Sequence, residues 1–163
     1  MAAVVIADAS PLIGLARVNG LSWLQALFQE VLVTDVVIGE VLTGTFPESE
    51  STIQAALTAG WLKVVNSTAQ EPELPDLDEG EVASIRLALE APGEALLLID
   101  ERAGRSVAQE LGLRVAGTAA VIGLAKQHGL IESARTVFAE LHVSDFRIAA
   151  AVIQTVLERC GET

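Results

Sequence analysis

Two aspartates directly follow apolar runs that are typical of buried β-strands. Asp8 comes after Val4–Ala7, and Asp100 comes after Leu96–Ile99. Each also precedes a segment with a helical pattern. In an open parallel sheet, ligands bind beside the carboxyl ends of the strands, at the point where the strand order reverses. We therefore expect both carboxylates at such a crevice; the alternative is that each one caps the helix that follows it.

A third carboxylate, Glu40, falls on a largely apolar helical stripe, one turn from Val36 and Val37. This spacing predicts that Glu40 faces the fold. A buried carboxylate without a partner is costly, so it needs a cation, a proton or several hydrogen-bond donors. The alternative is a partly exposed position at the edge of the fold.

A fourth carboxylate, Glu81, has two interpretations that both stay open. The run Asp78-Glu-Gly-Glu81 fits a capping box, with Asp78 as the N-cap and Glu81 three residues later. Glu81 also shares a helical face with Ile85 and Leu89, which directs it toward the sheet. Capping and a role in a site are equally compatible with this pattern.

Carboxylates gathered in one cavity cannot all stay ionised without compensating charge. Mg²⁺ or Mn²⁺ provides that charge, prefers oxygen ligands and keeps waters that can be activated for in-line attack on a phosphodiester. The predicted catalytic and metal-binding set is Asp8, Glu40, Glu81 and Asp100. Two residues are supporting candidates: Ser10, which either holds a ligand water or phosphate or only caps a helix, and Glu101.

The elements that must position these residues alternate between strand and helix. The predicted strands are Ala3–Ala7, Val31–Thr34, Leu62–Val65, Ala95–Ile99 and Leu113–Ala116. Nearly continuous apolar strands indicate a sheet covered on both faces, so we expect an α/β fold, a three-layer α/β/α sandwich with a central, mostly parallel sheet of about five strands. Its helices are expected to begin near Ser10, with Pro11 as the first helical residue, and at the positions Leu21, Thr34 or Asp35, Ser49, Glu81, Arg102, Thr118, Ser133 and Arg147.

The bulk properties bound the kind of protein. We expect one domain over residues 1–163, because 163 residues suffice for a single core. No apolar run is long enough for a membrane span and the first residues lack a secretory signal, which favours a cytoplasmic protein. The single cysteine, Cys160, excludes an internal disulfide and a multi-cysteine zinc site. A net charge of −12 opposes binding of nucleic acid, although divalent cations or a basic partner protein would offset it.

The ordered motifs resemble those of PIN domains. Val5–Ile13, with Asp8 and Ser10, resembles the family's opening strand followed by Asp-x-Ser/Thr, and Val36–Val41 is similar to its second acidic motif. The later motifs resemble a prokaryotic branch close to VapC-like toxins: Leu77–Glu81, Leu98–Arg105, Gly117-Thr118, Ala125-Lys126 and Gly129–Ile131. The resemblance spans residues 4 to 155.

This resemblance implies a PIN fold, ribonuclease activity that depends on Mg²⁺ or Mn²⁺, a homodimer and, for toxin members, inhibition by a cognate antitoxin. It implies the same four acidic residues as the site. Two positions depart from the pattern: Glu101 stands where the branch often has a second aspartate, and Glu81 stands where other branches carry aspartate. The longer side chains would change the spacing of metal ligands.

Three basic residues are candidates for contacting RNA phosphates. Arg102 and Arg105 closely follow Asp100, and Lys126 lies on a later helix that would return to the same rim. The alternative is that all three are solvated helix residues, with Glu101 and Arg105 paired one turn apart.

The leading hypothesis is an endoribonuclease, and the second is a PIN-like module that binds RNA or protein without catalysis. A phosphotransferase or nucleotide-binding protein is disfavoured because no glycine-rich phosphate loop follows a strand. A serine hydrolase is disfavoured because the chain has only His128 and His142 and no Gly-x-Ser-x-Gly motif.

Overall fold

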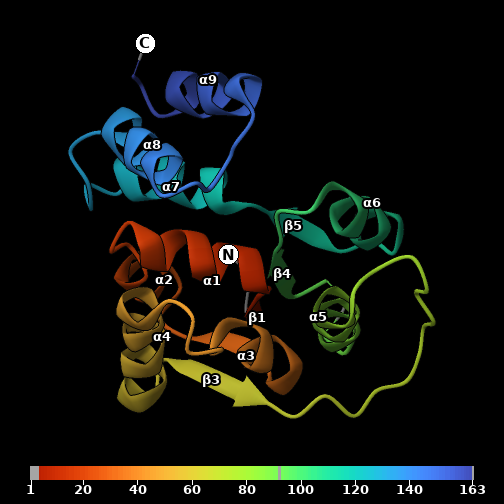
Figure 1. Cartoon of the computed structure of the whole chain (residues 1–163). Helices are drawn as coiled ribbons and strands as arrows, with labels where there is room; N and C mark the ends of the chain where they lie inside the picture. The colour runs from red at the N-terminus through yellow and green to blue at the C-terminus, as the bar shows by residue number, and fades with distance from the viewer. Residues whose placement is uncertain (1–3, 92, 163) are drawn as a thin grey trace.

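Five short apolar segments pair side by side into one parallel sheet. The computed structural model describes residues 4–91 and 93–162. The strands are β1 (Val4–Ala7), β2 (Val31–Thr34), β3 (Leu62–Val65), β4 (Ala95–Leu98) and β5 (Arg114–Ala116), in the order β3-β2-β1-β4-β5 (Figure 1). Every neighbouring pair is parallel, which confirms the predicted fold class. The predicted strand positions agree to within a residue, except that Ala3, the predicted start of the first strand, lies outside the described residues.

Alternate residues of the central strands enter two separate apolar cores. In β1, Val5 and Ala7 pack into the core on one face of the sheet, whereas Ile6 packs into the core on the other face. Leu97 and Leu98 of β4 divide in the same way. Because both faces are buried, the strands are apolar at successive positions rather than at every second position.

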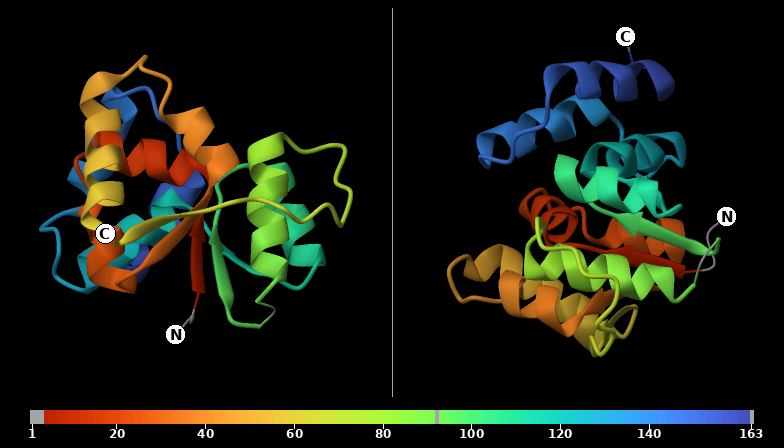
Figure 2. Two further views of the ribbon diagram at one scale, coloured as in Figure 1. Left: turned by 90° about the horizontal axis from the view of Figure 1, so that it is seen from below. Right: turned by 90° about the vertical axis from the view of Figure 1, so that its right-hand side faces the viewer.

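Helices cover both faces of this sheet (Figure 2). The first core is closed by α1 (Ala9–Arg17), α2 (Ser22–Phe28), α4 (Pro47–Ala59) and α7 (Thr118–Gln127), and the second by α5 (Glu79–Leu89) and α6 (Arg102–Glu110). Two further helices, α8 (Ala134–Val143) and α9 (Ala150–Arg159), stack on α7. In the described part of the chain, no helix is long and apolar enough to cross a membrane.

The short helix α3 (Asp35–Val41) lies at the carboxyl edge of the sheet and packs against both α1 and α5. Thr34 forms its N-cap, because the Thr34 hydroxyl accepts a hydrogen bond from the backbone N–H of Val37 at 3.1 Å. Helix α3 therefore joins the two helical layers at the edge where the predicted site residues lie.

Four predicted helix starts were wrong. Helix α4 begins at Pro47 rather than Ser49, and α5 begins at Glu79 rather than Glu81. Helix α1 begins at Ala9 with Asp8 at the N-cap, so Pro11 is its third residue rather than its first. Proline is accepted there because the first N–H groups of a helix have no intrahelical partner. Helix α9 begins at Ala150 rather than Arg147, because the chain first crosses α1, where Phe146 packs on Gly14.

The strand order creates a switch point between β1 and β4. From β1 the chain moves outward through β2 and β3, and it then returns to the other side of β1 to add β4 and β5. Ala7 and Leu98 are partners in the register of β1 and β4. Asp8 and Asp100 therefore extend from adjacent strand ends at the switch point, as the sequence predicts.

Candidate active site

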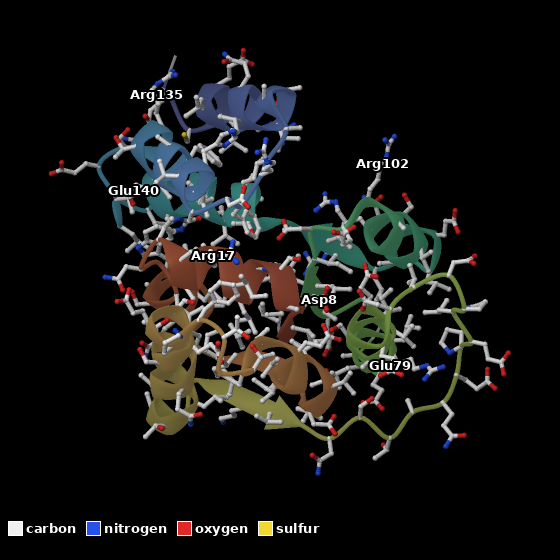
Figure 3. All side chains as sticks on the ribbon, viewed as in Figure 1. Asp8, Arg17, Glu79, Arg102, Arg135 and Glu140 are labelled. Atoms are coloured by element: carbon white, nitrogen blue, oxygen red, sulfur yellow. The ribbon has the colours of Figure 1, made fainter. Side chains whose placement is uncertain are left out.

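Asp8 lies between α1 and α5 at the carboxyl end of β1 (Figure 3). Its side chain is 4% exposed, and Oδ1 accepts a hydrogen bond from the Ser84 hydroxyl at 3.2 Å. Asp8 occupies the N-cap position of α1, but its side chain makes no capping hydrogen bond. The pKa of Asp8 is raised from 3.8 to about 7, mainly by burial. The charges of Glu81 and Asp78 raise this pKa further, whereas hydrogen bonds from the Ala9 N–H and the Ser84 hydroxyl lower it.

Glu81, on the first turn of α5, caps the helix and also faces inward, as both of its sequence patterns predict. It forms the predicted capping box: its N–H donates to Asp78 Oδ1 at 2.8 Å, and its Oε1 accepts from the Asp78 N–H at 3.3 Å. The side chain is only 6% exposed, and its other oxygen, Oε2, is buried without a hydrogen-bond partner among the described residues. Burial is the main cause that raises the pKa of Glu81, and the neighbouring charges of Asp78 and Glu101 raise it further.

Asp100, at the end of β4, is held by the start of α7. Oδ1 accepts from the backbone N–H of Thr118 at 2.8 Å, and Oδ2 accepts from the Thr118 hydroxyl at 2.7 Å. Burial raises the pKa of Asp100, while the Thr118 hydrogen bonds and the Arg105 charge act in the opposite direction. A Cβ at Gly117 would lie 2.7 Å from Asp100 Oδ1, so this contact requires glycine. Glu101, not Asp100, is the N-cap residue of α6.

Glu40 is exposed, so the prediction that it faces the fold was wrong. Helix α3 turns Val37 and Val41 into the core, and Glu40 lies beside that buried face. Its carboxylate leans on the N-terminus of α5, where a Cβ at Gly80 would collide with it. Partial burial and the charge of Asp78 raise the pKa of Glu40.

The structure thus places the acidic residues around the N-terminus of α5, but they do not all interact with one another equally. Asp8, Glu81 and Asp78 influence one another electrostatically, and Asp78 links this group to Glu40. Asp100 stands at the adjacent strand end but is turned toward Thr118. Within residues 4–91 and 93–162, no three carboxylate, imidazole or thiolate groups already surround one point closely enough to hold a metal ion.

The supporting and basic candidates lie in different places. Ser10, Glu101, Arg102 and Arg105 line one hollow with Asp100, and the Arg105 guanidinium donates to the Ile99 carbonyl at 3.0 Å. Lys126 is eight residues beyond Thr118 on α7, about 12 Å along the helix, and donates to the Glu132 carbonyl. The structure therefore does not bring Lys126 to the rim of the site.

Three residues of the site were absent from the predicted set. The sequence pattern predicts only a capping role for Asp78, it gives no distinctive signal for Ser84, and it assigns no contact to Thr118 of the Gly-Thr motif. Only the three-dimensional packing shows that Ser84 donates to Asp8 and Thr118 to Asp100.

The chemistry of this site fits a hard divalent cation. Its donors are carboxylate oxygens, and Glu81 Oε2 is a buried acceptor that lacks a partner among the described residues. Asp8 is nearby, buried and close to other negative charges. A cation between these groups would satisfy this oxygen and offset both the burial, which is the main cause of the raised pKa values, and the repulsion that adds to it.

The family comparison agrees with this fold. A family model described as "DUF3368: PIN domain" matches residues 4–162. The chain belongs to the PIN-domain family. PIN domains are generally nucleases and typically use divalent metal ions, which fits the chemistry of the carboxylate cluster.

One solved structure similar to this PIN domain is a PilT N-terminus domain protein, SSO1118, from the hyperthermophilic archaeon Sulfolobus solfataricus P2. The TM-score is 0.52 at 17% sequence identity, covering 72% of this chain and 90% of that one. At this identity the likeness supports the fold alone. No curated protein matches the chain. The predicted resemblance to PIN domains is confirmed, whereas closeness to VapC-like toxins stays a prediction.

Proposed function

We propose that this PIN domain is an endoribonuclease that depends on Mg²⁺ or Mn²⁺. The observation that carries the proposal is that Glu81, whose buried Oε2 has no hydrogen-bond partner among the described residues, lies near enough to buried Asp8 for its charge to raise the pKa of Asp8. Leaving such an acceptor unsatisfied costs about 1–3 kcal/mol, and more for a charged group. A protein that keeps this arrangement needs a ligand that satisfies it, and a divalent cation does so.

Asp8 and Glu81 would hold the ion, with Asp100 on the adjacent strand and Glu40 at the outer side of the cluster. When bound, the ion would polarise the phosphodiester and activate water for its hydrolysis. The orientation of the protein groups is already fixed by Ser84 for Asp8, by the capping box for Glu81 and by Thr118 for Asp100. Fixed ligands lower the reorganisation needed when substrate arrives.

Proton occupancy gives the site a pH dependence. Burial raises the pKa of Asp8 to about 7, so the protonated and ionised forms of Asp8 coexist in the metal-free protein near neutral pH. A cation competes with that proton, because both neutralise the same carboxylate. Binding of the ion is therefore expected to strengthen as the pH rises through 7.

Arg102 and Arg105 are the basic groups that would contact the substrate phosphates, since both line a hollow with Asp100. A toxin role fits the charge of the chain: an antitoxin with a basic segment would be attracted to a protein of net charge −12. The homodimer, the antitoxin and the cytoplasmic location remain predictions.

The alternative function is an RNA- or protein-binding module without catalysis. It is favoured by one observation: no three acidic groups in the described part of the chain are already arranged around an ion. The two functions make different predictions about the effect of a chelator, which removes cleavage but leaves metal-free binding intact.

Cleavage of a mixed RNA pool tests the proposal. Wild type should cut RNA with Mg²⁺ or Mn²⁺ and lose the activity in EDTA, while Asp8→Asn and Asp100→Asn should stay folded and inactive under all conditions. Arg135→Ala, an exposed α8 residue remote from the cluster, is the matched control and should cut like wild type (Figure 3). Folded wild type that cuts nothing with either metal would favour the binding module.

A further inference from the structure

We propose that one unpaired nucleobase of the RNA substrate stacks on Phe46, in a hollow next to the carboxylate site. This inference rests on the proposed function and adds to it a contact for a base. It depends on one exposed aromatic ring, the contacts that hold this ring, and two hollows that meet.

Phe46, between α3 and α4, is the exception among the aromatic side chains. The chain has four phenylalanines, two tryptophans and no tyrosine. All six lie in the described residues, and the other five are buried or half-buried. Phe46 is 55% exposed. An exposed aromatic ring presents a face on which a base of any sequence can stack.

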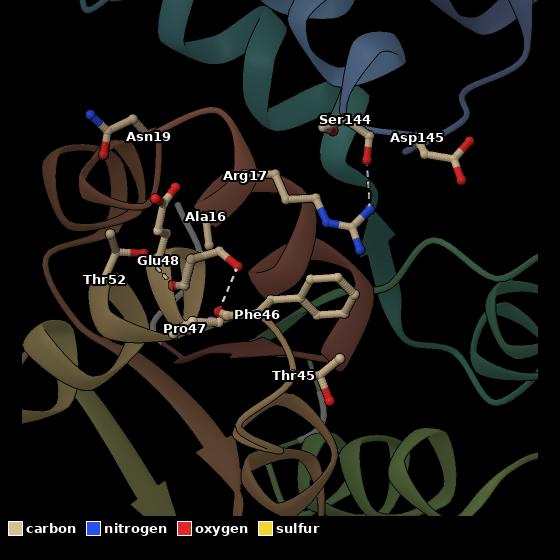
Figure 4. Close-up of a pocket in the computed structure, with 11 residues that line it drawn as sticks. Ala16, Arg17, Asn19, Thr45, Phe46, Pro47, Glu48, Thr52, Ser144 and Asp145 are labelled. Atoms are coloured by element: carbon tan, nitrogen blue, oxygen red, sulfur yellow. Dashed lines mark hydrogen bonds between the residues drawn. The ribbon is translucent and has the colours of Figure 1, made fainter.

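The position of Phe46 is fixed rather than free. The Glu50 carboxylate accepts hydrogen bonds from the backbone N–H groups of Gly44 at 2.7 Å and Phe46 at 2.6 Å. The Arg17 guanidinium lies 5.3 Å from the centre of the Phe46 ring and donates to the Ser144 carbonyl at 3.1 Å (Figure 4). The ring is thus presented at the surface by its neighbours, which reduces the entropy lost when a ligand binds.

The hollow around Phe46 suits a base better than a phosphate. Its volume is about 860 Å³, and its polar lining includes Asn19, Thr52, Glu48 and Asp145. Amide, hydroxyl and carboxylate groups pair with the edges of bases, and carboxylates also accept from the amino groups of bases. Two acidic residues, Glu48 and Asp145, outnumber the single cation of the lining, Arg17, so the formal charge of this hollow is negative by one, which favours a neutral base over a phosphate.

A second hollow, of about 890 Å³, suits the phosphates. It contains Asp100 and four of the ten basic residues of the chain, namely Arg102, Arg105, Arg147 and Arg159. Its acidic residues are Asp100, Glu101 and Asp145, so its formal charge is positive by one in a chain of net charge −12. The second hollow is thus a local basic region beside the carboxylate site.

The two hollows meet along α1. Asp145 lines both of them. The segment between α8 and α9 runs beside α1, with Ser144 bonded to Arg17 at one end and Phe146 packed on Gly14 farther along. Ser10 and Arg17, which line the second and the first hollow, are seven residues apart on this helix, or about 10 Å. A strand with phosphates in the second hollow can therefore reach Phe46.

Single strands are favoured over duplexes because stacking on Phe46 needs an unpaired base. The bases of an A-form duplex are stacked and paired, whereas those of a single strand can turn outward onto an aromatic ring. Both hollows have the size of a pocket for one small ligand rather than the width of a double helix.

The test is binding of a fluorescent single-stranded RNA in EDTA, where metal-dependent cleavage does not occur. Phe46→Ala should weaken binding about 5- to 100-fold, because one base–aromatic stack is lost. Leu130→Ala, which truncates another exposed apolar residue, is the control and should bind like wild type. The loss in Phe46→Ala should vanish with an RNA that carries abasic positions throughout, and duplex RNA should bind wild type more weakly than the single strand.

The same assay tests the phosphate path. Arg147→Ala should weaken RNA binding. It should also make the affinity fall less steeply with salt concentration, by the amount expected for about one lost phosphate contact. The cation control Arg135→Ala should change neither. Equal binding by wild type and Phe46→Ala, an equal loss on abasic RNA, no preference for the single strand, or no RNA binding at all would overturn the inference. Cleavage is measured separately. If Phe46→Ala binds RNA like wild type but metal-dependent cleavage is intact, the nuclease proposal stands without the stack. If Phe46→Ala binds RNA more weakly but no metal-dependent cleavage occurs, only the stack stands.

Discussion

Replacing Asp8 by asparagine removes the most strongly perturbed charge of the site and nearly preserves its shape. The Ser84 hydroxyl, which lies 3.2 Å from Asp8 Oδ1, still finds an oxygen acceptor in asparagine. Asparagine also mimics the protonated form of Asp8, which the folded protein favours because the side chain is 4% exposed. In the absence of metal, we expect Asp8→Asn to stabilise the protein.

The magnitude follows from the difference between the folded and unfolded states. The pKa of Asp8 rises from 3.8 to about 7 on folding. The folded state thus binds the proton more tightly, so the contribution of Asp8 to stability is fully present below 3.8 and is lost as the pH rises through 7. Relative to low pH, the stability lost through Asp8 is about 4 kcal/mol at pH 8, and less than about 2 kcal/mol at pH 5, where folded Asp8 is still protonated and only the unfolded chain ionises.

Urea unfolding of wild type and Asp8→Asn in EDTA, at pH 5 and pH 8, measures this difference. The gain in the free energy of unfolding should be larger at pH 8 than at pH 5 by about 2–3 kcal/mol. Addition of Mg²⁺ at pH 8 should reverse the order, because only wild type keeps the full set of ligands. A variant that is less stable than wild type at pH 8 without metal, or a gain independent of pH, would refute the reasoning.

Three further predictions concern the neighbours of the cluster. Gly104→Ala places a Cβ 2.5 Å from Glu81 Oε2, so its free energy of unfolding in urea should fall by about 1–3 kcal/mol. The control Gly39→Ala, whose Cβ would have no atom within 4 Å, should raise the free energy of unfolding by up to about 1 kcal/mol. Thr118→Val removes the hydroxyl that donates to Asp100 Oδ2 at 2.7 Å, which should cost about 1–3 kcal/mol of stability and reduce the rate of RNA cleavage. Thermal unfolding should show that Mg²⁺ raises the Tm of wild type with increasing concentration, and that Glu81→Gln loses this response.

Each of these results can fail in a defined way. Equal stability of Gly104→Ala and wild type would show that the Glu81 carboxylate is not held against α6. A wild-type rate of cleavage in Thr118→Val would show that the hydroxyl bond does not position Asp100. An unchanged response of Glu81→Gln to Mg²⁺ would exclude Glu81 as a ligand of the ion.

The fold was predictable because each strand carries its own signal. The runs before Asp8 and Asp100 are apolar at successive positions, which indicates burial on both faces, and the structure confirms this for Val5 and Ile6 in opposite cores. Helix ends were less predictable. The start of α9 depends on Phe146 packing on Gly14, a contact between segments far apart in the chain that local sequence does not encode.

For the site, the sequence predicted the positions of residues better than their orientations. Asp8 and Asp100 lie at adjacent strand ends because strand order alone determines it. Glu40 is exposed because α3 is an edge helix that buries only Val37 and Val41, and periodicity does not show where a helix lies in the fold. The bond from Thr118 to Asp100 links two elements whose contact appears only after folding.

Direct measurement of Mn²⁺ binding by electron paramagnetic resonance tests the central claim, that the carboxylates around Asp8 and Glu81 form one metal centre. We predict that folded wild type at pH 8 binds Mn²⁺ at one site, that Mg²⁺ competes for this site, and that Asp8→Asn and Glu81→Gln lose it while Glu140→Gln, an exposed α8 variant far from the cluster (Figure 3), keeps it. Binding that is absent from wild type, or that is equal in wild type and Asp8→Asn, would contradict the account.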